Sequence, residues 1–382
     1  MRSPRCSPRV DRALGGVRAL AAVLLVAACG RSSPTGVATP QAEPRADASA
    51  EAATTATKAA PRRRSHEDRA MGTRVTLTAV VPSEVDDARA EAAFAAAMAE
   101  LRRVESLMTT WRDDSEISRL NAAAGRSAVV VSPDTWRVLE ASLWASRASG
   151  GAFDVTFEAM HGVWRFDQDR DPHPPPAREV ARARALVDWT KLRMDGASRS
   201  VKLEARGMRV GLGGIAKGYG VDRAAAVLLE RGLTDFAVQA GGDLYTHGEK
   251  APGVPWSVGI RDPRGAEGEY FASLPVGDHA FSTAGDYERS YVVGGRRYHH
   301  IIDPHTGYPA TASRSVTIWA KDALTADAVD DAVFILGPDK GLALVESIDD
   351  CGAVIVDAAN RVWVSKRLEG KAVVLRQPTD GL

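Results

Sequence analysis

Residues 296 to 309, RRYHHIIDPHTGYP, contain side chains that can do chemistry: the imidazoles of His299, His300 and His305 and the carboxylate of Asp303. Histidine takes up or releases a proton near neutral pH and is also a common metal ligand. These histidines lack the i, i+4 helical spacing of a zinc protease, and no glutamate lies among them. Adjacent side chains of a strand point to opposite faces, so at most one of His299 and His300 faces a given site. The segment could be a catalytic corner, a metal site or the polar end of a hairpin with solvated histidines.

A glycine-rich segment, MRVGLGGIAKGYG, is the second candidate. Gly211, Gly213 and Ala216 match the G-x-G-x-x-A pattern of dinucleotide-binding loops. That interpretation also requires a βαβ unit with an acid near the end of the second strand, whereas the next strand ends AVQAGGD with Asp243 too far along. Two interpretations remain: tight packing of a strand on a helix, or a different phosphate site at a helix N-terminus where Lys217 adds charge.

The segment TADAVDDAVFILG is the third candidate. Asp327 and Asp331 are four residues apart, so on a helix their carboxylates lie one turn apart on the same face. Two like charges on a face that continues into VFIL are unfavourable unless a cation lies between them. Hard oxygen ligands favour Mg²⁺ or Ca²⁺ over zinc. The alternative is a solvated acidic helix start that the helix dipole stabilises.

Strands and helices must position these residues. MGTRVTLTAVV, from Met71, alternates like a half-buried strand, and residues 83–108 predict a helix capped by Ser83. A second helix begins at Ser132-Pro133 and ends at Gly150-Gly151. The remaining predictions are a hairpin over 192–205, a helix from the glycine segment to Gly232, several strands, a helix over 323–336 and a terminal hairpin. The pattern predicts an α+β domain with mostly hairpin-linked strands.

The N-terminus predicts export and anchoring. Residues 1–28 combine an arginine-rich start with the apolar run ALAAVLLVAA, which is a signal peptide and too short to span a bilayer. Cys29 follows a lipobox-like Val-Ala-Ala, so we expect it to carry lipid. An ordinary secretory cleavage near the same alanines is the alternative. Residues 29–65, rich in Ala, Pro, Thr and Ser and closed by PRRRS, predict a disordered tether before a single domain at 66–382.

Charge and cysteine content narrow the function further. The chain has 382 residues, with 49 Lys plus Arg and 49 Asp plus Glu, and this zero net charge argues against a nucleic-acid partner. Cys6 lies in the predicted signal peptide and Cys29 is the predicted lipid site, which leaves Cys351 alone in the folded body. An exported domain without an internal disulfide must rely on its hydrophobic core.

Read together, the segments resemble a known family. MGTRVTL, TTWRDDSEISRLN, GGAFDVT, LGGIAKGYGVDRA, AGGD, YHHIIDPHTG and ADAVDDAVFILG occur in this order between Met71 and about Val345. The chain thus resembles the ApbE family, the FAD:protein FMN transferases. The resemblance implies a periplasmic, often lipid-anchored enzyme with a T-fold-like α+β domain, mostly antiparallel sheet packed with helices, that binds FAD and Mg²⁺. Such enzymes move FMN from FAD to a threonine or serine of a membrane redox subunit and release AMP.

The resemblance also assigns individual residues. The cofactor contacts that it implies are Met71, Trp111, Ala152, Phe153, Asp154, Lys217 and Ile301. The metal ligands that it implies are the Gly214 carbonyl and the side chains of Asp327 and Asp331. Trp111 stands where many relatives have tyrosine, and an indole can stack equally well on a flavin or adenine face.

This chain departs from the family pattern at two positions. Gly211 replaces the aspartate of D-L-G-x-I-A-K-G, so one cofactor contact is lost or supplied by another group. Asp331 replaces the threonine of D-A-x-x-T, which should strengthen binding of a divalent ion but adds negative charge near a pyrophosphate. Both changes leave a metal site plausible.

The resemblance also suggests a role for the opening segment. His300 occupies the family's H-I-[IL]-D-P histidine, and we expect it to be the base that accepts the proton of the incoming hydroxyl. Asp303 would orient His300 or hold the turn, and His299 and His305 would face solvent. The alternatives are an FAD pyrophosphatase that uses water, a flavin-binding lipoprotein without chemistry, and a Rossmann oxidoreductase.

Overall fold

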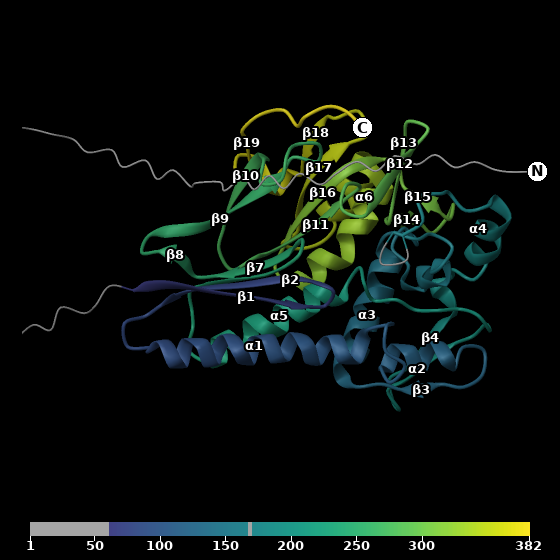
Figure 1. The fold of residues 1–382 in the computed structure, drawn as a ribbon, viewed down its shortest axis with the longest axis horizontal. Helices are drawn as coiled ribbons and strands as arrows, with labels where there is room; N and C mark the ends of the chain where they lie inside the picture. The colour runs from purple at the N-terminus through teal and green to yellow at the C-terminus, as the bar shows by residue number, and fades with distance from the viewer. Residues whose placement is uncertain (1–60, 167–169) are drawn as a thin grey trace, which may run out of the picture. The chain divides into compact units, whose positions relative to one another are not determined.

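The computed structural model describes residues 61–166 and 170–382, and the predicted signal peptide, Cys29 and most of the tether lie outside them. A large antiparallel sheet runs through the molecule (Figure 1). Its strands, in spatial order, are β1 (Arg62–Ala70), β2 (Thr73–Val81), β6 (Phe236–Ala240), β7 (Asp243–His247), β11 (Ala280–Gly285), β16 (Ser313–Ala320), β17 (Gly352–Asp357) and β18 (Val362–Val364). Sheet and helices together confirm the predicted α+β class.

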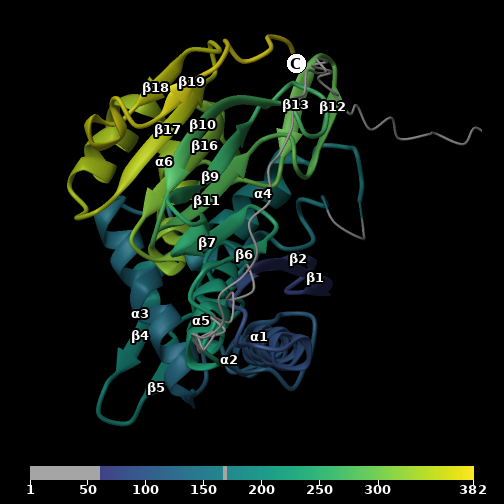
Figure 2. The same ribbon diagram turned by 90° about the vertical axis from the view of Figure 1, so that its left-hand side faces the viewer.

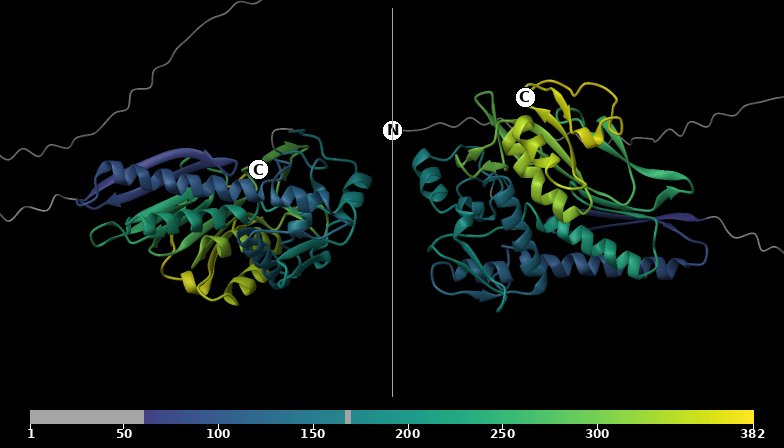
Figure 3. Two further views of the ribbon diagram at one scale, coloured as in Figure 1. Left: turned by 90° about the horizontal axis from the view of Figure 1, so that it is seen from below. Right: turned by 180° about the vertical axis from the view of Figure 1, so that it is seen from behind.

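Three helices cover one face of this sheet: α1 (Asp87–Met108), α5 (Ala216–Glu230) and α6 (Ala323–Glu346). Figure 3 shows α1 and α5 side by side beneath the strands. The alternation of a strand sends Ile318 and Ile355 into the core on the helical side. α6 is kinked at Gly337, which has φ 72° and ψ −177° and precedes Pro338, so its first limb matches the helix predicted over 323–336.

The opposite face carries a second, four-stranded sheet: β19 (Val373–Val374), β10 (Tyr270–Val276), β9 (Val254–Arg261) and β8 (Glu249–Ala251). Phe281, Trp319 and Val354, each next in sequence to a residue of the helical-side core, pack with the apolar side chains of this sheet. Figure 2 shows the layers edge-on. Every named strand pair in the described residues is antiparallel, which fits hairpin-linked strands.

Smaller elements frame one end of the main sheet. They are α2 (Glu116–Ala122), α3 (Pro133–Ala148), α4 (Ala177–Arg184), the 3₁₀ turns η1 (Val155–Met160) and η2 (Trp189–Lys191), and the strands β3 (Val129–Val130), β4 (Leu192–Asp195), β5 (Ser200–Leu203), β12 (Ser290–Val293), β13 (Arg296–His299), β14 (Ile302–Asp303) and β15 (Tyr308–Pro309). A third 3₁₀ turn, η3 (Lys366–Leu368), packs on β17 instead. The predicted hairpin over 192–205 is β4–β5. Trp164, Phe166, Tyr298 and Tyr308 stack between α4 and β12–β15 and build a separate aromatic core there.

Two predicted boundaries differ from the structure. The tether was expected to continue to Ser65, but β1 begins at Arg62 and pairs in register with β2, so the basic residues belong to an edge strand. Asp86, and not Ser83, caps α1: its carboxylate accepts the Arg89 N–H at 2.7 Å. Asp86 directly precedes the first helical residue, Asp87, whereas Ser83 lies three residues earlier, so the carboxylate of Asp86 is the one that reaches the free N–H groups of the first turn. No helix within residues 61–166 and 170–382 is long and apolar enough to cross a membrane.

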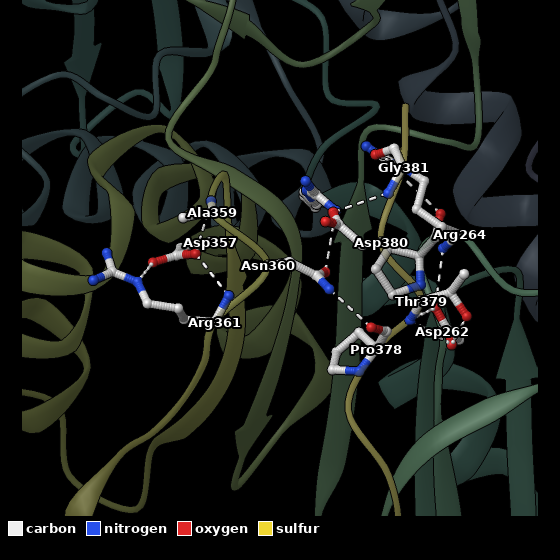
Figure 4. Close-up of polar contacts among 12 residues, drawn as sticks. Asp262, Arg264, Asp357, Ala359, Asn360, Arg361, Pro378, Thr379, Asp380 and Gly381 are labelled. Carbon is white, nitrogen blue, oxygen red and sulfur yellow. Dashed lines mark hydrogen bonds and ion pairs between the residues drawn. The ribbon is translucent and has the colours of Figure 1, made fainter.

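The C-terminal segment is fixed by polar contacts (Figure 4). The carboxylate of Asp262 accepts the Thr379 N–H at 3.1 and 3.0 Å and the Thr379 hydroxyl at 2.8 Å. The Asn360 side chain donates to the Pro378 carbonyl at 2.8 Å. Asp262 is fully buried, and its neighbours hold the pKa of its carboxyl below the usual value in spite of burial. The last residues therefore close the end of the molecule that carries β9 and β10.

Candidate functional site

Three of the predicted segments meet at Gly214. A β-carbon placed on Gly214 would lie 3.0 Å from Oδ2 of Asp331 and 3.6 Å from the ring of Phe153. The GGAFD turn, the glycine segment and α6 are therefore in contact, although more than one hundred residues separate the first from the last. A side chain at Gly214 would push the loop away from Asp331, so close packing explains why a glycine occupies this position.

The glycine segment leads into α5, whose first turn holds Lys217. The Lys217 ammonium donates to the Gly213 carbonyl at 2.9 Å and lies 3.3 Å from Oδ1 of Asp327 and 3.4 Å from Oδ2 of Asp243. Burial alone would lower the pKa of Lys217, but Asp243 and Asp327 hold it above its usual value. Lys217 is thus a fixed positive charge beside the predicted metal ligand Asp327 as well as a candidate phosphate contact.

Asp327 joins the two helices. Its Oδ2 accepts the Gly218 N–H of α5 at 2.8 Å, and its side chain is 2 % exposed. A β-carbon on Gly218 would lie 2.7 Å from Cβ of Asp327, so only glycine permits this approach of α5 to α6. One turn later, Asp331 lies on the same face, as predicted, and burial raises the pKa of its carboxyl to about 6 against the pull of Lys217.

A second layer of acids lies behind these residues, and the sequence interpretation missed it. Ser282 Oγ of β11 is 2.6 Å from Oδ1 of Asp243 and 2.6 Å from Oδ2 of Asp330. A hydroxyl has one hydrogen to donate, so one of these two carboxyl groups must hold a proton to complete both bonds. Burial, reinforced by Asp331 and Asp327, raises the pKa of Asp330 well above its usual value. The AGGD motif was the only sequence signal for Asp243; nothing local indicated Ser282.

The chemistry of these acidic side chains fits a hard divalent cation. Asp243, Asp327 and Asp331 lie around the Lys217 ammonium, and among the described residues Oδ2 of Asp243 is buried with no hydrogen bond and has only the ion pair with Lys217 at 3.4 Å. An excess of buried carboxylate over positive charge fits a cation with oxygen ligands. Within the part of the chain that the structure describes, no three His, Cys, Asp or Glu side chains form a complete metal site. An ion would therefore also need backbone and substrate oxygens, as expected for Mg²⁺.

The two adjacent histidines have different surroundings. The prediction that His299 faces solvent is wrong: it is 3 % exposed, its Nε2 lies 2.8 Å from the Ala310 carbonyl, and its ring meets Phe334 edge-on. β13 ends at His299, so strand alternation no longer decides where His300 points. Nδ1 of His300 is buried and has no hydrogen bond within the described residues. Burial first, and then the charge of Arg289, lowers the pKa of His300 to about 3.

The loop between β11 and β12 holds His300 in place. The His300 N–H donates to the Arg289 carbonyl at 3.1 Å. The loop begins at Asp286, whose carboxylate makes two bonds of 2.7 Å with the guanidinium of Arg264, one of the residues in Figure 4. Both side chains of this pair are nearly buried, so the pair is a rigid support. Arg264 also donates to the Gly381 carbonyl at 3.3 Å, which connects the loop to the C-terminal segment.

Asp303 holds its own turn. Its Oδ1 accepts the His305 N–H at 2.9 Å and lies 3.1 Å from Nδ1 of His305, and its carbonyl accepts the Gly307 N–H at 2.8 Å. No bond from Asp303 to His300 occurs within the described residues. Asp303 was predicted either to orient His300 or to hold the turn, and its contacts fit the second role. His305 is exposed, as predicted, yet its Nε2 also lies 3.2 Å from the Gly150 carbonyl.

The predicted cofactor residues fall into buried and accessible groups. Ala152, Phe153 and Ile301 are buried. Met71, at φ 53° in the turn between β1 and β2, packs on α5 at Gly220. Trp111 is 63 % exposed and meets the ring of His161 edge-on, with 5.8 Å between centroids. Trp111 is therefore the one of these five residues most available for stacking.

Asp154 points into the fold. Its carboxylate accepts the N–H and hydroxyl of Thr156 at 2.8 and 2.6 Å and the Trp189 N–H at 2.9 Å. Burial raises the pKa of Asp154 in spite of these bonds. The contacts make it the residue that shapes the GGAFD turn, whether or not it also meets a ligand.

The aspartate that the family pattern places at residue 211 has a spatial replacement. A β-carbon on Gly211 would lie 2.5 Å from Oε2 of Glu158, so the Glu158 carboxylate occupies the space beside Gly211. Glu158 is 8 % exposed and lies 3.5 Å from Nδ1 of His161 and 3.6 Å from a guanidinium nitrogen of Arg209. The sequence interpretation missed Glu158, because its relation to Gly211 exists only in the folded chain.

Comparisons with known proteins agree with this geometry. The model of the ApbE family matches residues 71–355. The FAD:protein FMN transferase of Treponema pallidum is 36 % identical over 72 % of this chain and 80 % of its own length. The one from Klebsiella pneumoniae is 33 % identical over 68 % of this chain and 76 % of its own.

Solved structures give the same result. The ApbE protein of Thermotoga maritima is 30 % identical, with a TM-score of 0.72 over 81 % of this chain and 99 % of its own. The flavin transferase ApbE of Vibrio cholerae is 27 % identical, with a TM-score of 0.73 and the same coverage. The likeness confirms the predicted fold class.

Proposed function

Because the chain belongs to the ApbE family, we propose that it is an FAD:protein FMN transferase. In this proposal FMN moves from FAD to a threonine or serine hydroxyl of a membrane redox protein, and AMP is released. The observation that supports it most is the meeting of Phe153, Gly214 and Asp331, which brings three separate motif segments to one place beside Lys217. This meeting supports a joint role for Phe153, Gly214 and Asp331 in the proposed site.

In the proposed reaction an oxygen–phosphorus bond forms between the acceptor hydroxyl and the FMN phosphorus, and the bond between that phosphorus and the bridging oxygen breaks. AMP leaves with the bridging oxygen. Asp327, Asp331 and the Gly214 carbonyl would hold Mg²⁺, which when bound neutralises phosphoryl charge. Lys217 would face the pyrophosphate from the first turn of α5, where N–H groups and the helix dipole also favour an anion.

His300 would accept the proton of the acceptor hydroxyl. Its low pKa keeps the ring neutral near pH 7, so the ring is free to accept a proton. A base with so low a pKa is weak in the protein alone. A pyrophosphate nearby would raise the pKa of His300, because negative charge stabilises the imidazolium. The base would thus become effective when the substrate is bound.

The proposed FAD contacts combine one exposed aromatic side chain with buried and partly buried apolar ones. Trp111 would stack on an aromatic face of FAD, with Met71, Phe153, Ala152 and Ile301 as apolar walls. Glu158 would take over the contact of the aspartate that Gly211 lacks. The strand context disfavours a dinucleotide fold, so FAD should bind more tightly than NAD(P).

We also propose that the protein lies on the periplasmic side of the cell envelope, anchored through lipid on Cys29. The support is the sequence alone: the apolar run before Val-Ala-Ala-Cys and the tether that follows it. The domain begins at Arg62, so the tether between lipid and first strand is about thirty residues long. That length allows the domain to reach a membrane-bound acceptor.

One experiment tests the activity. The domain is incubated with FAD, Mg²⁺ and a flavin-acceptor domain, and the acceptor is weighed by intact-mass spectrometry. A mass gain equal to FMN on the acceptor, with AMP in solution, is the expected result. Free FMN and AMP without labelled acceptor would mean a pyrophosphatase, and bound but intact FAD would mean a flavin-binding protein. Either of these two results would overturn the transferase proposal.

A further inference from the structure

His305 connects two turns that are far apart in the sequence. Its Nδ1 lies 3.1 Å from Oδ1 of Asp303 in its own turn, and its Nε2 lies 3.2 Å from the carbonyl of Gly150 in the GGAFD turn. A β-carbon on the next residue, Gly151, would lie 3.6 Å from Nε2 of His305. Gly151 has φ 85°, a conformation that favours glycine, so the chain approaches the ring closely here.

Both neighbours of the ring are hydrogen-bond acceptors. A carbonyl oxygen and a carboxylate oxygen can only receive a hydrogen, so both ring nitrogens must donate to complete the bridge. Neutral imidazole carries one N–H and imidazolium carries two. The complete bridge therefore requires the protonated ring.

The two turns carry groups of the proposed site. The GGAFD turn continues into Ala152 and Phe153, and the other turn follows directly from His300 and Ile301. We infer that His305 is a positioning residue: its imidazolium ties the Gly150 carbonyl to the Asp303 carboxylate and sets the separation of the two cofactor-binding turns. This inference rests on the proposed function. It makes FAD affinity depend on pH, because the bridge is complete only while both ring nitrogens carry a hydrogen.

Other charged groups bear on this bridge. Arg184 of α4 donates through Nε to the His305 carbonyl at 2.6 Å, and its positive charge opposes protonation of the ring. Asp303 favours protonation. The carboxylate of Asp154 in the GGAFD turn accepts hydrogen bonds from the N–H groups of Thr156 and Trp189, neither of which belongs to the bridge. Asp303 is the group in contact with the ring that stabilises its charge, at hydrogen-bond distance.

The test compares His305→Gln with the unmodified domain. Glutamine carries both of its N–H donors on a single nitrogen and does not titrate, so it cannot span the two acceptors as the two ring nitrogens do, and its contacts do not change with pH. The matched control is His173→Gln, since His173 is also exposed and also paired with an aspartate, Asp171, and within the described residues its ring bonds Asp171 rather than either of these turns. FAD affinity is measured by flavin fluorescence from pH 5.5 to 8.5 in the presence of chelator, which removes metal binding from the comparison.

Between pH 5.5 and 8.5, the affinity for FAD should fall in the unmodified domain and in His173→Gln. This fall should exceed any fall in His305→Gln by roughly tenfold, which corresponds to about 1.4 kcal/mol. Parallel curves for all three proteins would overturn the inference. Groups such as Asp331 titrate equally in all three and cancel. In turnover assays the variant should change KM for FAD and leave kcat nearly unaltered, since the ring does not touch the reacting atoms.

A second readout does not depend on FAD. In proteins with isotope-labelled histidine and glycine, the ring signal missing from His305→Gln identifies His305, and the amide signal of Gly151 should move with it as pH rises. The bridge would be refuted if the His305 ring signal at pH 5.5 were that of neutral imidazole. It would also be refuted if the Gly151 amide signal did not change with pH together with the ring signal. Failure to bind FAD at any pH would instead refute the proposed function, while the ring titration would still decide on the bridge.

Discussion

Replacement of Asp327 tests both the metal proposal and the packing of α5 on α6, and the two effects can be separated. Asp327→Ala removes the acceptor of the buried Gly218 N–H and one of the two carboxylates beside Lys217. A buried N–H without a partner costs about 1–3 kcal/mol, and removal of one partner of a buried ion pair costs about 3–5 kcal/mol. Asp243 and the Gly213 carbonyl still hold Lys217, so we expect a total near 3 kcal/mol.

Asp327→Asn is the sharper variant. Its amide oxygen can still accept the Gly218 N–H, so the stability loss should be about 1 kcal/mol. At roughly 2 °C per kcal/mol for a domain of this size, the melting temperature should fall by about 6 °C for Ala and about 2 °C for Asn. Both variants should lose at least about a hundredfold in Mg²⁺-dependent FMN transfer, because each lacks one charged oxygen ligand.

The assay measures thermal unfolding in chelator and FMN transfer over a range of Mg²⁺ concentrations. Asp330→Asn is the matched control, because Asp330 is buried on the same helix turn but bonds Ser282. Its high pKa indicates that it already carries a proton, so the amide should keep the Mg²⁺ response. If Asp327→Asn transfers FMN at the unmodified rate in chelator, Asp327 is not a metal ligand. If Asp330→Asn loses the Mg²⁺ response instead, the ligand assignment moves to Asp330.

His300→Asn should lower FMN transfer by roughly 10²- to 10⁴-fold with FAD affinity little changed, measured by mass analysis and flavin fluorescence; an unaltered rate would place the base elsewhere. Asp331→Thr should keep activity and weaken the pH dependence of Mg²⁺ affinity near pH 6, measured by titration calorimetry; unchanged pH dependence would exclude Asp331 as its source. Burial raises the pKa of Asp222 to about 7, so its stabilising contribution is present below pH 4 and lost as pH rises to 7. Denaturant unfolding should show this decline, and Asp222→Asn should flatten it; equal slopes would refute the assignment. Cys29→Ser should leave the protein folded but unlipidated, and unchanged membrane partitioning in cell fractionation would contradict the lipobox.

The sequence predicted those parts of the fold that depend on local patterns. The helix predicted over 323–336 is the first limb of α6, and the alternation of MGTRVTLTAVV predicted β2, whereas β1 begins within the predicted tether. The facing of His299 could not be predicted, since β13 ends there and the contacts to Ala310 and Phe334 come from later segments. Alternation applies only while a strand continues.

The proposed site divides in the same way. Asp327 and Asp331 share a helical face because of their spacing, and this was predictable. Ser282 gave no signal, since its meaning depends on two aspartates that approach it from β7 and α6. Burial makes His299→Asn a stability variant that should cost about 1–3 kcal/mol.

The two departures from the family pattern have opposite consequences for charge. At Gly211 a carboxylate is absent from the sequence, yet Glu158 fills the vacated space, so the local charge is restored from another segment. At Asp331 a carboxylate is added, while the Lys217 ammonium is already paired with Asp243 and Asp327. Burial answers part of this excess by raising the pKa of Asp331 to about 6, so near that pH the side chain spends part of its time as a neutral hydroxyl donor, as threonine is. At higher pH the charge of Asp331 must be balanced by a cation. The ionised carboxylate should bind that cation more strongly, but it also repels the negative charge of the pyrophosphate. If Asp331 is a metal ligand as proposed, metal affinity should rise and substrate affinity should fall as its carboxyl loses its proton, and a threonine at position 331 should show neither dependence.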